Sequence, residues 1–289
     1  MNALTKYIWS LLGGLFPVTA TRIAYFKAKR TPLHLGTPQL FDEKLEYLKL
    51  FQYANDPLVA RCSDKYAVRE FVAKRGCDRF LNELYGVWNS PDEISFETLP
   101  DKFALKCTHG CHMNIICADK AQIDIIATKK QLAKWLTEKQ WKIQQELHYR
   151  LIRPQIICEK YLVSGWGGEL PEDYKIYCFN GEPKLVLLTT NRNPHDETQV
   201  ELTFRDVDWN HLDIGNRKSN LDIPAPSCLP DMLQCARLLS AGFPFVRVDF
   251  YDIGGKAIFG EMTFTPAGAN ADYYTVDGQK MLGRMLDIS

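Results

Sequence analysis

Charged residues occur in the segment FVRVDFYDIGGKAIFGEMTFTP, residues 245–266, which otherwise reads as an apolar hairpin. Side chains two apart in a strand point the same way, so Arg247 and Asp249 share one face, as do Glu261 and Thr263 on the second strand. Two carboxylates and a hydroxyl are hard oxygen ligands suited to Mg²⁺. The planar guanidinium could hold a phosphoryl oxygen. A structural Arg–Asp pair beside a solvated Glu explains the same residues.

The turn DIGG decides whether the two carboxylates meet. A register change of one residue sends every side chain of a strand to the opposite face. Pairing Tyr251 with Lys256 would separate Asp249 from Glu261, whereas a three- or five-residue loop would bring them together. A bulge at Gly254-Gly255 would do the same. We predict one of the arrangements that put both carboxylates on a common face.

A lysine followed by a small loop is a second candidate site. Lys106 lies at the end of the alternating segment KFALKC, residues 102–107, and Gly110 lies in the loop THGCHMN that follows. An ammonium group beside exposed loop N–H groups suits a phosphate. A lysine at a strand end is also often simply solvated.

The same loop contains four possible zinc ligands, which are Cys107, His109, Cys111 and His112. Structural zinc sites usually take paired ligands from two separated places in the chain, and no second cluster follows this one. The sequence therefore favours a loop without bound metal.

Two further strands contain charged residues. In DYKIYCF, residues 173–179, Asp173 and Lys175 share one face, either as a solvated ion pair or as part of a site. In the apolar run around Glu159, an unpaired carboxylate would be costly, so Glu159 needs a protein donor or a ligand hydroxyl as its partner.

The elements that position these residues can be predicted from periodicity and turn residues. A hairpin is expected around Asn180-Gly181, and residues 191–229 are expected to form a long polar loop. Strands grouped with helices at intervals indicate an α+β or mixed α/β fold. Helices are predicted at 37–52, 62–76, near 129–149 and near 230–242, and strands at 102–107, 155–162, 173–179, 184–190 and within 245–266.

Composition excludes some classes of protein. Lys+Arg and Asp+Glu both number 35, so the formal net charge is zero, and a nucleic-acid binder normally has a basic excess. The nine cysteines are scattered without a regular framework, which favours reduced thiols and a cytoplasmic protein.

The segment YIWSLLGGLFPVTA, residues 7–20, is apolar but shorter than the roughly 20 residues that span a bilayer. It lacks the pattern of a signal peptide. A short helix packed on the domain is the simpler interpretation, and weak attachment to an anionic membrane surface, at the inner face of the membrane, is the alternative. The basic residues that would support attachment are Lys6, Arg22, Lys27, Lys29 and Arg30.

Taken in order, these motifs resemble the TupA-like ATP-grasp family of surface-polysaccharide biosynthesis, within the ATP-grasp superfamily. The resemblance covers roughly residues 30–270. It implies an α+β ATP-grasp fold in which two lobes hold the nucleotide, with a helical segment at 1–62, an N-lobe at 63–160 and a C-lobe at 161–289. The motifs are TPQLFDEKLEYLKL, SDKYAVREFV, LPDKFALKCTHG, DYKIYCFNG, FVRVDFY and GEMTFTP.

The resemblance also implies a role for each candidate residue. Lys106 would contact the nucleotide phosphates, Arg247 would stabilise the transferring phosphoryl group, and Lys175 would assist it. Thr263 stands where many relatives have an asparagine, which puts a second metal ion in doubt. The metal candidates are Asp249, Glu261 and Thr263. The loop at 108–114 would close over the phosphates and is called the covering loop. The remaining nucleotide-binding candidates are Lys65 and Asp173, then His109 and Gly110 in the covering loop, and Glu159, Lys160, Tyr161 and Leu162 in the hinge that would contact the adenine.

The implied activity is ATP-dependent carboxylate–amine ligation through an acyl phosphate, with ATP and Mg²⁺ as cofactors. The implied amine donor is an amino acid, and the implied acceptor is a saccharide containing a uronic acid, in a capsular or other surface polysaccharide. Two alternatives remain open. One is a sugar kinase that uses the same nucleotide site, and the other is a non-catalytic nucleotide-binding partner of a glycosyltransferase.

Overall fold

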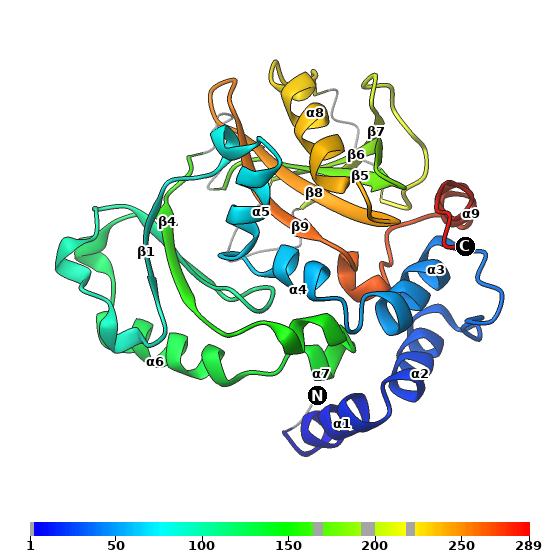
Figure 1. Ribbon diagram of the computed structural model, residues 1–289, viewed down its shortest axis with the longest axis horizontal. Coiled ribbons are helices and arrows are strands. Elements are labelled where there is room, and N and C mark those ends of the chain that lie inside the picture. Colours follow the sequence, from blue (N-terminus) through cyan, green and yellow to red (C-terminus); the bar gives the residue numbers. More distant parts are fainter. Residues whose placement is uncertain (1–2, 164–169, 192–199, 218–222) are drawn as a thin grey trace.

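The computed structural model describes residues 3–163, 170–191, 200–217 and 223–289 (Figure 1). In this part of the chain the strands form two antiparallel sheets. The smaller sheet has the strand order β1-β4-β2-β3, and the larger one has the order β7-β6-β5-β8-β9. Helices pack against both sheets, and the combination of antiparallel sheets with helices confirms the predicted α+β class.

The smaller sheet consists of β1 (Leu84–Trp88), β2 (Phe103–Cys107), β3 (Asn114–Cys117) and β4 (Ile156–Lys160). Alternate residues of β2, including Phe103 and Leu105, are buried in a core that Leu132 of α6 (Ile125–Thr137) completes. The period of two therefore sends Lys106 to the opposite face. Glu159 of β4 lies on that face as well, because it is paired with Ala104.

The larger sheet consists of β5 (Asp173–Phe179), β6 (Glu182–Thr190), β7 (Glu201–Asp206), β8 (Phe245–Asp252) and β9 (Ala257–Thr263). Helix α8 (Leu229–Ser240) packs on one face, where the Cys178 thiol contacts the Ala236 carbonyl. On the other face, the Phe41 ring lies 5.2 Å from the Phe245 ring. Arg247 and Asp249 follow Phe245 along this second face.

The helices before the smaller sheet pack mainly on the larger one. They are α3 (Phe41–Tyr47), continued by a π-helix (Leu48–Gln52), then α4 (Pro57–Ser63) and α5 (Val68–Lys74). The helix predicted at 62–76 is divided, because the Asp64 carboxylate accepts the N–H groups of Tyr66 and Ala67 and starts a new turn. Gly76, the last residue of the predicted range, follows α5 and has a positive φ of 73°, which favours glycine after a helix.

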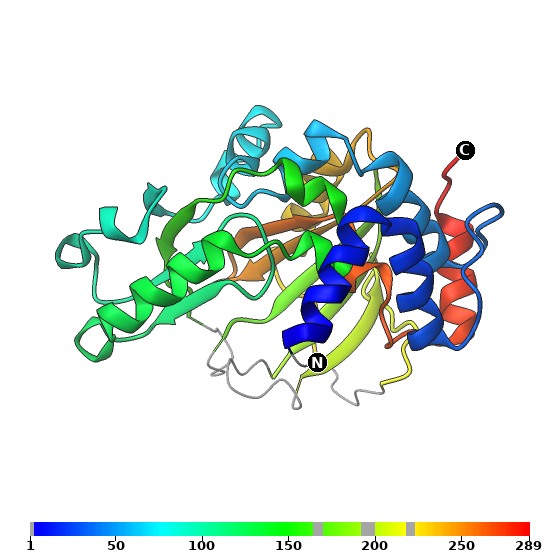
Figure 2. The same cartoon turned by 90° about the horizontal axis from the view of Figure 1, so that it is seen from below.

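The N-terminal helices α1 (Ala3–Leu15) and α2 (Pro17–Lys29) lie side by side, at the lower edge of the molecule in Figure 1 and in front of it in Figure 2. Helix α1 contacts α7 (Trp141–Gln144), and α9 (Val276–Met285) packs against α3. None of the helices in the described ranges has the length and apolar character needed to cross a bilayer.

Several elements differ from the prediction. Strands β1 and β3 and helix α9 were not predicted, and β7 lies in the stretch predicted as a loop. The helix predicted near 129–149 is interrupted after Thr137, and its last part forms a 3₁₀ turn. Among the residues that the structure describes, the 3₁₀ helices are Asp78–Phe80, Pro91–Glu93, Phe96–Thr98, Lys120–Gln122, Leu147–Leu151 and Pro266–Ala269.

Candidate active site

The β8–β9 hairpin places Asp249 directly opposite Glu261. Its tip is a two-residue turn of Gly254 and Gly255, with φ of 62° and 82°, the positive values that a type I′ turn requires. The register shifts between Asp249 and Phe250, which leaves Gly260 as the extra residue of a bulge. The predicted common face is therefore confirmed, but the bulge lies inside β9 and not at the turn.

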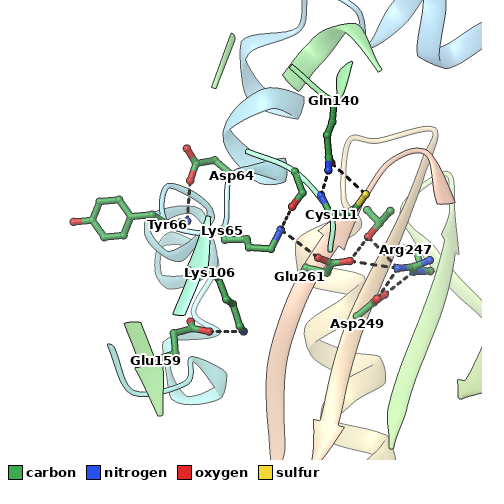
Figure 3. Close-up of polar contacts among 12 residues, drawn as sticks. Asp64, Lys65, Tyr66, Lys106, Cys111, Gln140, Glu159, Arg247, Asp249 and Glu261 are labelled. Carbon is green, nitrogen blue, oxygen red and sulfur yellow. Dashed lines mark hydrogen bonds and ion pairs between the residues drawn. The ribbon is translucent and has the colours of Figure 1, made fainter. Parts of the chain in front are cut away.

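Arg247 is the centre of the contacts on this face (Figure 3). Its Nε and Nη2 donate to Oδ1 and Oδ2 of Asp249 at 2.7 and 2.6 Å. Nη2 also donates to Oγ1 of Thr263 at 3.1 Å, and this hydroxyl donates to Oε1 of Glu261 at 3.0 Å. The guanidinium is thus oriented by three groups from two strands.

The two carboxylates have different surroundings. The Asp249 side chain is 3% exposed and also accepts from Nζ of Lys175 at 3.0 Å, so two cations compensate its burial. The Glu261 side chain is 42% exposed. Burial would raise the pKa of Glu261, but the charges of Lys65 and Arg247 outweigh this and hold that pKa below its usual value. Glu261 is therefore an ionised carboxylate that solvent and ligands can reach.

The residues present fit a magnesium ion held jointly with a substrate. In the described ranges, no group of three or more His, Cys, Asp or Glu side chains is arranged to hold a metal ion. Mg²⁺ does not need such a cage, because it usually takes one or two carboxylates and completes its shell with water and substrate phosphates. Asp249 and Glu261, opposite each other on neighbouring strands, supply that donor set.

On the smaller sheet, Lys106 and Glu159 form an ion pair of 2.7 Å. Arg69 of α5 contacts the second oxygen of Glu159 at 3.1 Å. Burial would lower the pKa of Lys106, but Glu159 and Tyr251 outweigh it and place that pKa above its usual value. The partner that the sequence required for Glu159 is thus a pair of protein cations. Arg69 was not predicted, since nothing in the sequence indicates which distant cation it would be.

Lys65 connects the covering loop to the hairpin. Its Nζ donates to the Gly110 carbonyl at 2.7 Å and lies 3.9 Å from Oε2 of Glu261. A Cβ added at Gly110 would lie 2.7 Å from Oε1 of Gln140, so the end of this side chain would have to shift. Gln140 also accepts the N–H of Cys111 at 3.2 Å, a contact that was not predicted. Figure 3 shows Lys65 pointing toward Glu261 of the hairpin, whereas Lys106, on the same side as Lys65, points to Glu159.

The other loop residues are divided between core and surface. His109 is buried, and burial lowers its pKa, with the backbone of Trp135 and Glu138 nearby. Cys107 is buried in the core of the smaller sheet, whereas Cys111 is exposed. The two cysteines therefore have different environments.

The candidate hinge residues are the last two of β4 and the two that follow it. The N–H of Lys160 donates to the Glu83 carbonyl at 2.9 Å, and its carbonyl accepts from Nδ2 of Asn82 at 2.9 Å. Both backbone groups of Lys160 are therefore used within the protein. Tyr161 and Leu162 are half-buried beyond it. Asp173, at the start of β5, forms an ion pair with Lys175.

Comparison with known proteins gives the family and the fold. A family model described as TupA-like ATPgrasp matches residues 43–287. A search of curated proteins found no match. Among solved structures, L-amino acid ligase from Bacillus licheniformis superposes with a TM-score of 0.50 at 10% identity, over 89% of this chain and 57% of that one. D-alanine–D-alanine ligase from Bacillus anthracis, complexed with ATP, gives a TM-score of 0.49 at 13% identity, over 79% of this chain and 66% of that one.

The chain thus spans less than two thirds of the length of these two ligases. The two-sheet architecture is that of the ATP-grasp fold. The family model covers most of the chain, including both sheets, the covering loop and the β8–β9 hairpin. The chain belongs to the TupA-like ATP-grasp family.

Proposed function

We propose that this protein is an ATP-dependent carboxylate–amine ligase that forms an amide through an acyl phosphate. The observation that carries the proposal is the position of Lys65, which contacts the covering loop through Gly110 and lies 3.9 Å from Glu261 of the hairpin. Cations beside the smaller sheet and carboxylates of the larger sheet therefore meet in one place. This arrangement suits a triphosphate carried with a divalent cation.

The proposed roles follow from charge and contacts. Lys65 and Lys106 bind phosphate oxygens of ATP. Asp249 and Glu261 hold Mg²⁺, which neutralises phosphate charge when it is bound. Arg247 is held in a fixed orientation by Asp249 and Thr263, and its guanidinium stabilises the charge on the transferring phosphoryl group. Lys175 supports the same charge from β5.

In the proposed reaction, a carboxylate oxygen of the acceptor attacks the γ-phosphorus, and the bond to the ADP oxygen breaks. An amine then attacks the acyl carbon, inorganic phosphate leaves, and the amine nitrogen loses a proton. The protein contributes positioning and charge stabilisation. This chemistry requires no Ser, Cys or His nucleophile.

The substrate classes rest on family membership. We propose an amino acid as the amine donor. The acceptor, whose carboxylate is activated, is a uronic acid of a capsular or other surface polysaccharide. Surface-polysaccharide biosynthesis is the setting that the TupA-like resemblance implies. The number of possible amino acids is small enough to be screened directly.

The test is an ADP-release screen of the twenty amino acids against saccharides that contain uronic acids, with amide formation followed by mass spectrometry. Hydroxylamine is added in a parallel set without amine, because it converts an acyl phosphate into a hydroxamate. ADP together with hydroxamate supports ligation. ADP with a phosphorylated sugar hydroxyl and no hydroxamate would identify a kinase. ATP binding without ADP release in any mixture would identify a non-catalytic protein.

A further inference from the structure

Helix α1 has an apolar stripe that faces solvent. Its large apolar residues recur at helical spacing, so they lie on one face. In a helix of a soluble domain this face normally packs on the core. Here their exposed fractions are 67, 63, 56, 41 and 70%, in the order Leu4, Tyr7, Ile8, Leu11 and Leu15.

The orientation of the stripe is fixed by contacts on the other side of α1. Nε1 of Trp9 donates to the Ile143 carbonyl of α7 at 3.0 Å. A Cβ at Gly13 would lie only 1.9 Å from the Lys142 carbonyl oxygen, so the helix backbone approaches α7 closely at this glycine. Helix α1 is therefore docked on the protein through Trp9 and Gly13, and the apolar stripe is left outside.

Helix α2, which contacts α1, and Phe16 just before it add further exposed apolar and basic side chains. Phe16 and Phe26 are 60% and 52% exposed. Lys27 lies 5.5 Å from the centre of the Trp9 ring, which places this cation beside α1. Lys6, Arg22 and Arg30 are exposed as well. Lys29 is different, because it forms a 2.6 Å ion pair with the buried Asp42.

Charge is distributed very unevenly along the chain. Residues 1–41 contain five of the 35 Lys and Arg residues and none of the 35 Asp and Glu residues. The rest of the chain therefore has a formal net charge of −5, although the whole chain is neutral. An anionic surface would attract the α1–α2 hairpin and repel the remainder, which would orient the molecule on that surface.

We propose that the α1–α2 hairpin binds the surface of an anionic lipid bilayer, with the apolar stripe inserted at the level of the headgroups. Amphipathic helices with a basic polar face bind membranes in this way, through buried apolar area together with attraction to anionic lipid. Each basic residue near such a surface contributes about 1 kcal/mol, which is roughly a fivefold gain in affinity. The proposed attachment is peripheral, and no helix in the described ranges could span the bilayer.

The test is co-sedimentation of the full chain with vesicles of phosphatidylcholine alone or of phosphatidylcholine mixed with phosphatidylglycerol. We expect wild type to bind the anionic vesicles at least about tenfold more strongly, and added salt to weaken the binding. Ile8→Glu with Leu11→Glu should abolish binding. Lys6→Gln with Arg22→Gln should weaken it by more than about tenfold, on the basis of two lost charges.

Matched controls alter exposed residues elsewhere. Ile126→Glu with Val276→Glu, and Lys102→Gln with Lys184→Gln, should bind like wild type, because these side chains are exposed on other elements. ATP affinity should be unchanged in every variant, so failure of the proposed ligase function would not affect this test. Equal binding to both vesicle types, or retained binding by the Ile8/Leu11 variant, would overturn the proposal. If wild type is a dimer, the Ile8/Leu11 variant is a monomer and neither binds vesicles, the apolar stripe would instead be a self-association surface.

Discussion

At the scale of single residues, Lys106 is paired but can exchange its partner. Glu159 is shared between Lys106 and Arg69, so Arg69 still compensates Glu159 when Lys106 turns to a phosphate. The Lys106 side chain is 22% exposed, which allows a ligand to reach it. The same sharing means that loss of Lys106 does not leave Glu159 without a cation.

We therefore expect Lys106→Met to weaken ATP binding without unfolding the protein. A lost charge-assisted contact is worth about 1.5–3 kcal/mol, or roughly a tenfold to hundredfold loss of affinity in calorimetry. Lys102→Met, an exposed lysine immediately before the same strand, is the control and should bind ATP normally. An unchanged affinity for Lys106→Met would remove this residue from the nucleotide site.

Asp249 and Glu261 should respond differently to the loss of charge. Both Asp249→Asn and Glu261→Gln are expected to abolish ADP formation, since each removes a carboxylate proposed to hold the metal ion. Only Asp249→Asn should also destabilise the fold, by about 3–5 kcal/mol, because it leaves the buried Arg247 without its carboxylate partner, whereas Lys175 keeps Asp173. Urea denaturation measures the difference. Equal stability of the two variants would contradict the burial argument.

At the scale of elements, sequence patterns predicted those strands that have a strong local signal. Strand β5 was predicted at its observed bounds, because its apolar run ends at Asn180-Gly181, a turn with positive φ at both residues. Strands β1, β3 and β7 were missed. Each is short, and no local pattern indicates their partner strands, which are β4, β2 and β6 respectively.

The bulge in β9 can be tested at Gly260. A Cβ at this position would lie 3.1 Å from the Asp249 carbonyl oxygen and 3.2 Å from the Tyr251 ring. Gly260→Val should therefore strain the bulge or shift the register, and either change moves Glu261 away from Asp249. We expect at least about a tenfold loss of ADP formation, equivalent to about 1.4 kcal/mol. Ile258→Val, in the regular part of the strand, should be nearly wild type.

Lys49 supports the loop that follows β9 from a buried position. It is 2% exposed, pairs with Glu46 at 2.6 Å and donates to the carbonyls of Gly268 and Gln144 at 2.8 and 3.1 Å. Lys49→Met should lower the free energy of unfolding by about 3–5 kcal/mol, because it leaves Glu46 buried without a cation. Lys74→Met breaks an exposed pair with Glu70 and should lower it by less than about 1 kcal/mol.

At the scale of the whole molecule, the sequence identified most charged residues that face the candidate site but few of their partners. Arg247 and Asp249 could be predicted to share a face from the period of a strand. Glu261 joins them only through the bulge at Gly260, whose position inside β9 was not predicted. The ion pair between Arg69 and Glu159 could not be predicted, because it depends on how α5 packs beside the smaller sheet. Local rules predict directions of side chains, whereas tertiary packing decides which charges meet.

The free energy of unfolding depends on pH through every group whose pKa changes on folding, and the buried His148 should make a measurable contribution. Burial, followed by the charge of Lys49, lowers the pKa of His148 to about 3. Within the described residues neither ring nitrogen has a hydrogen-bond partner, and the ring packs 4.5 Å from that of Tyr149. In the unfolded chain a histidine titrates near pH 6.5. Between these two pH values the unfolded state binds the additional proton, so protonation of His148 favours unfolding as the pH falls.

The folded-state pKa values of Glu46 and Asp42 are raised by burial to about 7 and about 6, which gives the opposite slope. That contribution is present in wild type and in His148→Phe alike and cancels in their difference. Relative to wild type, His148→Phe should therefore gain stability as the pH falls from about 6.5 toward 3, by up to about 1.4 kcal/mol per pH unit. Urea denaturation of both proteins across this range measures the gain. Parallel curves would show that His148 does not titrate differently in the folded state, and the buried neutral imidazole would have to be abandoned.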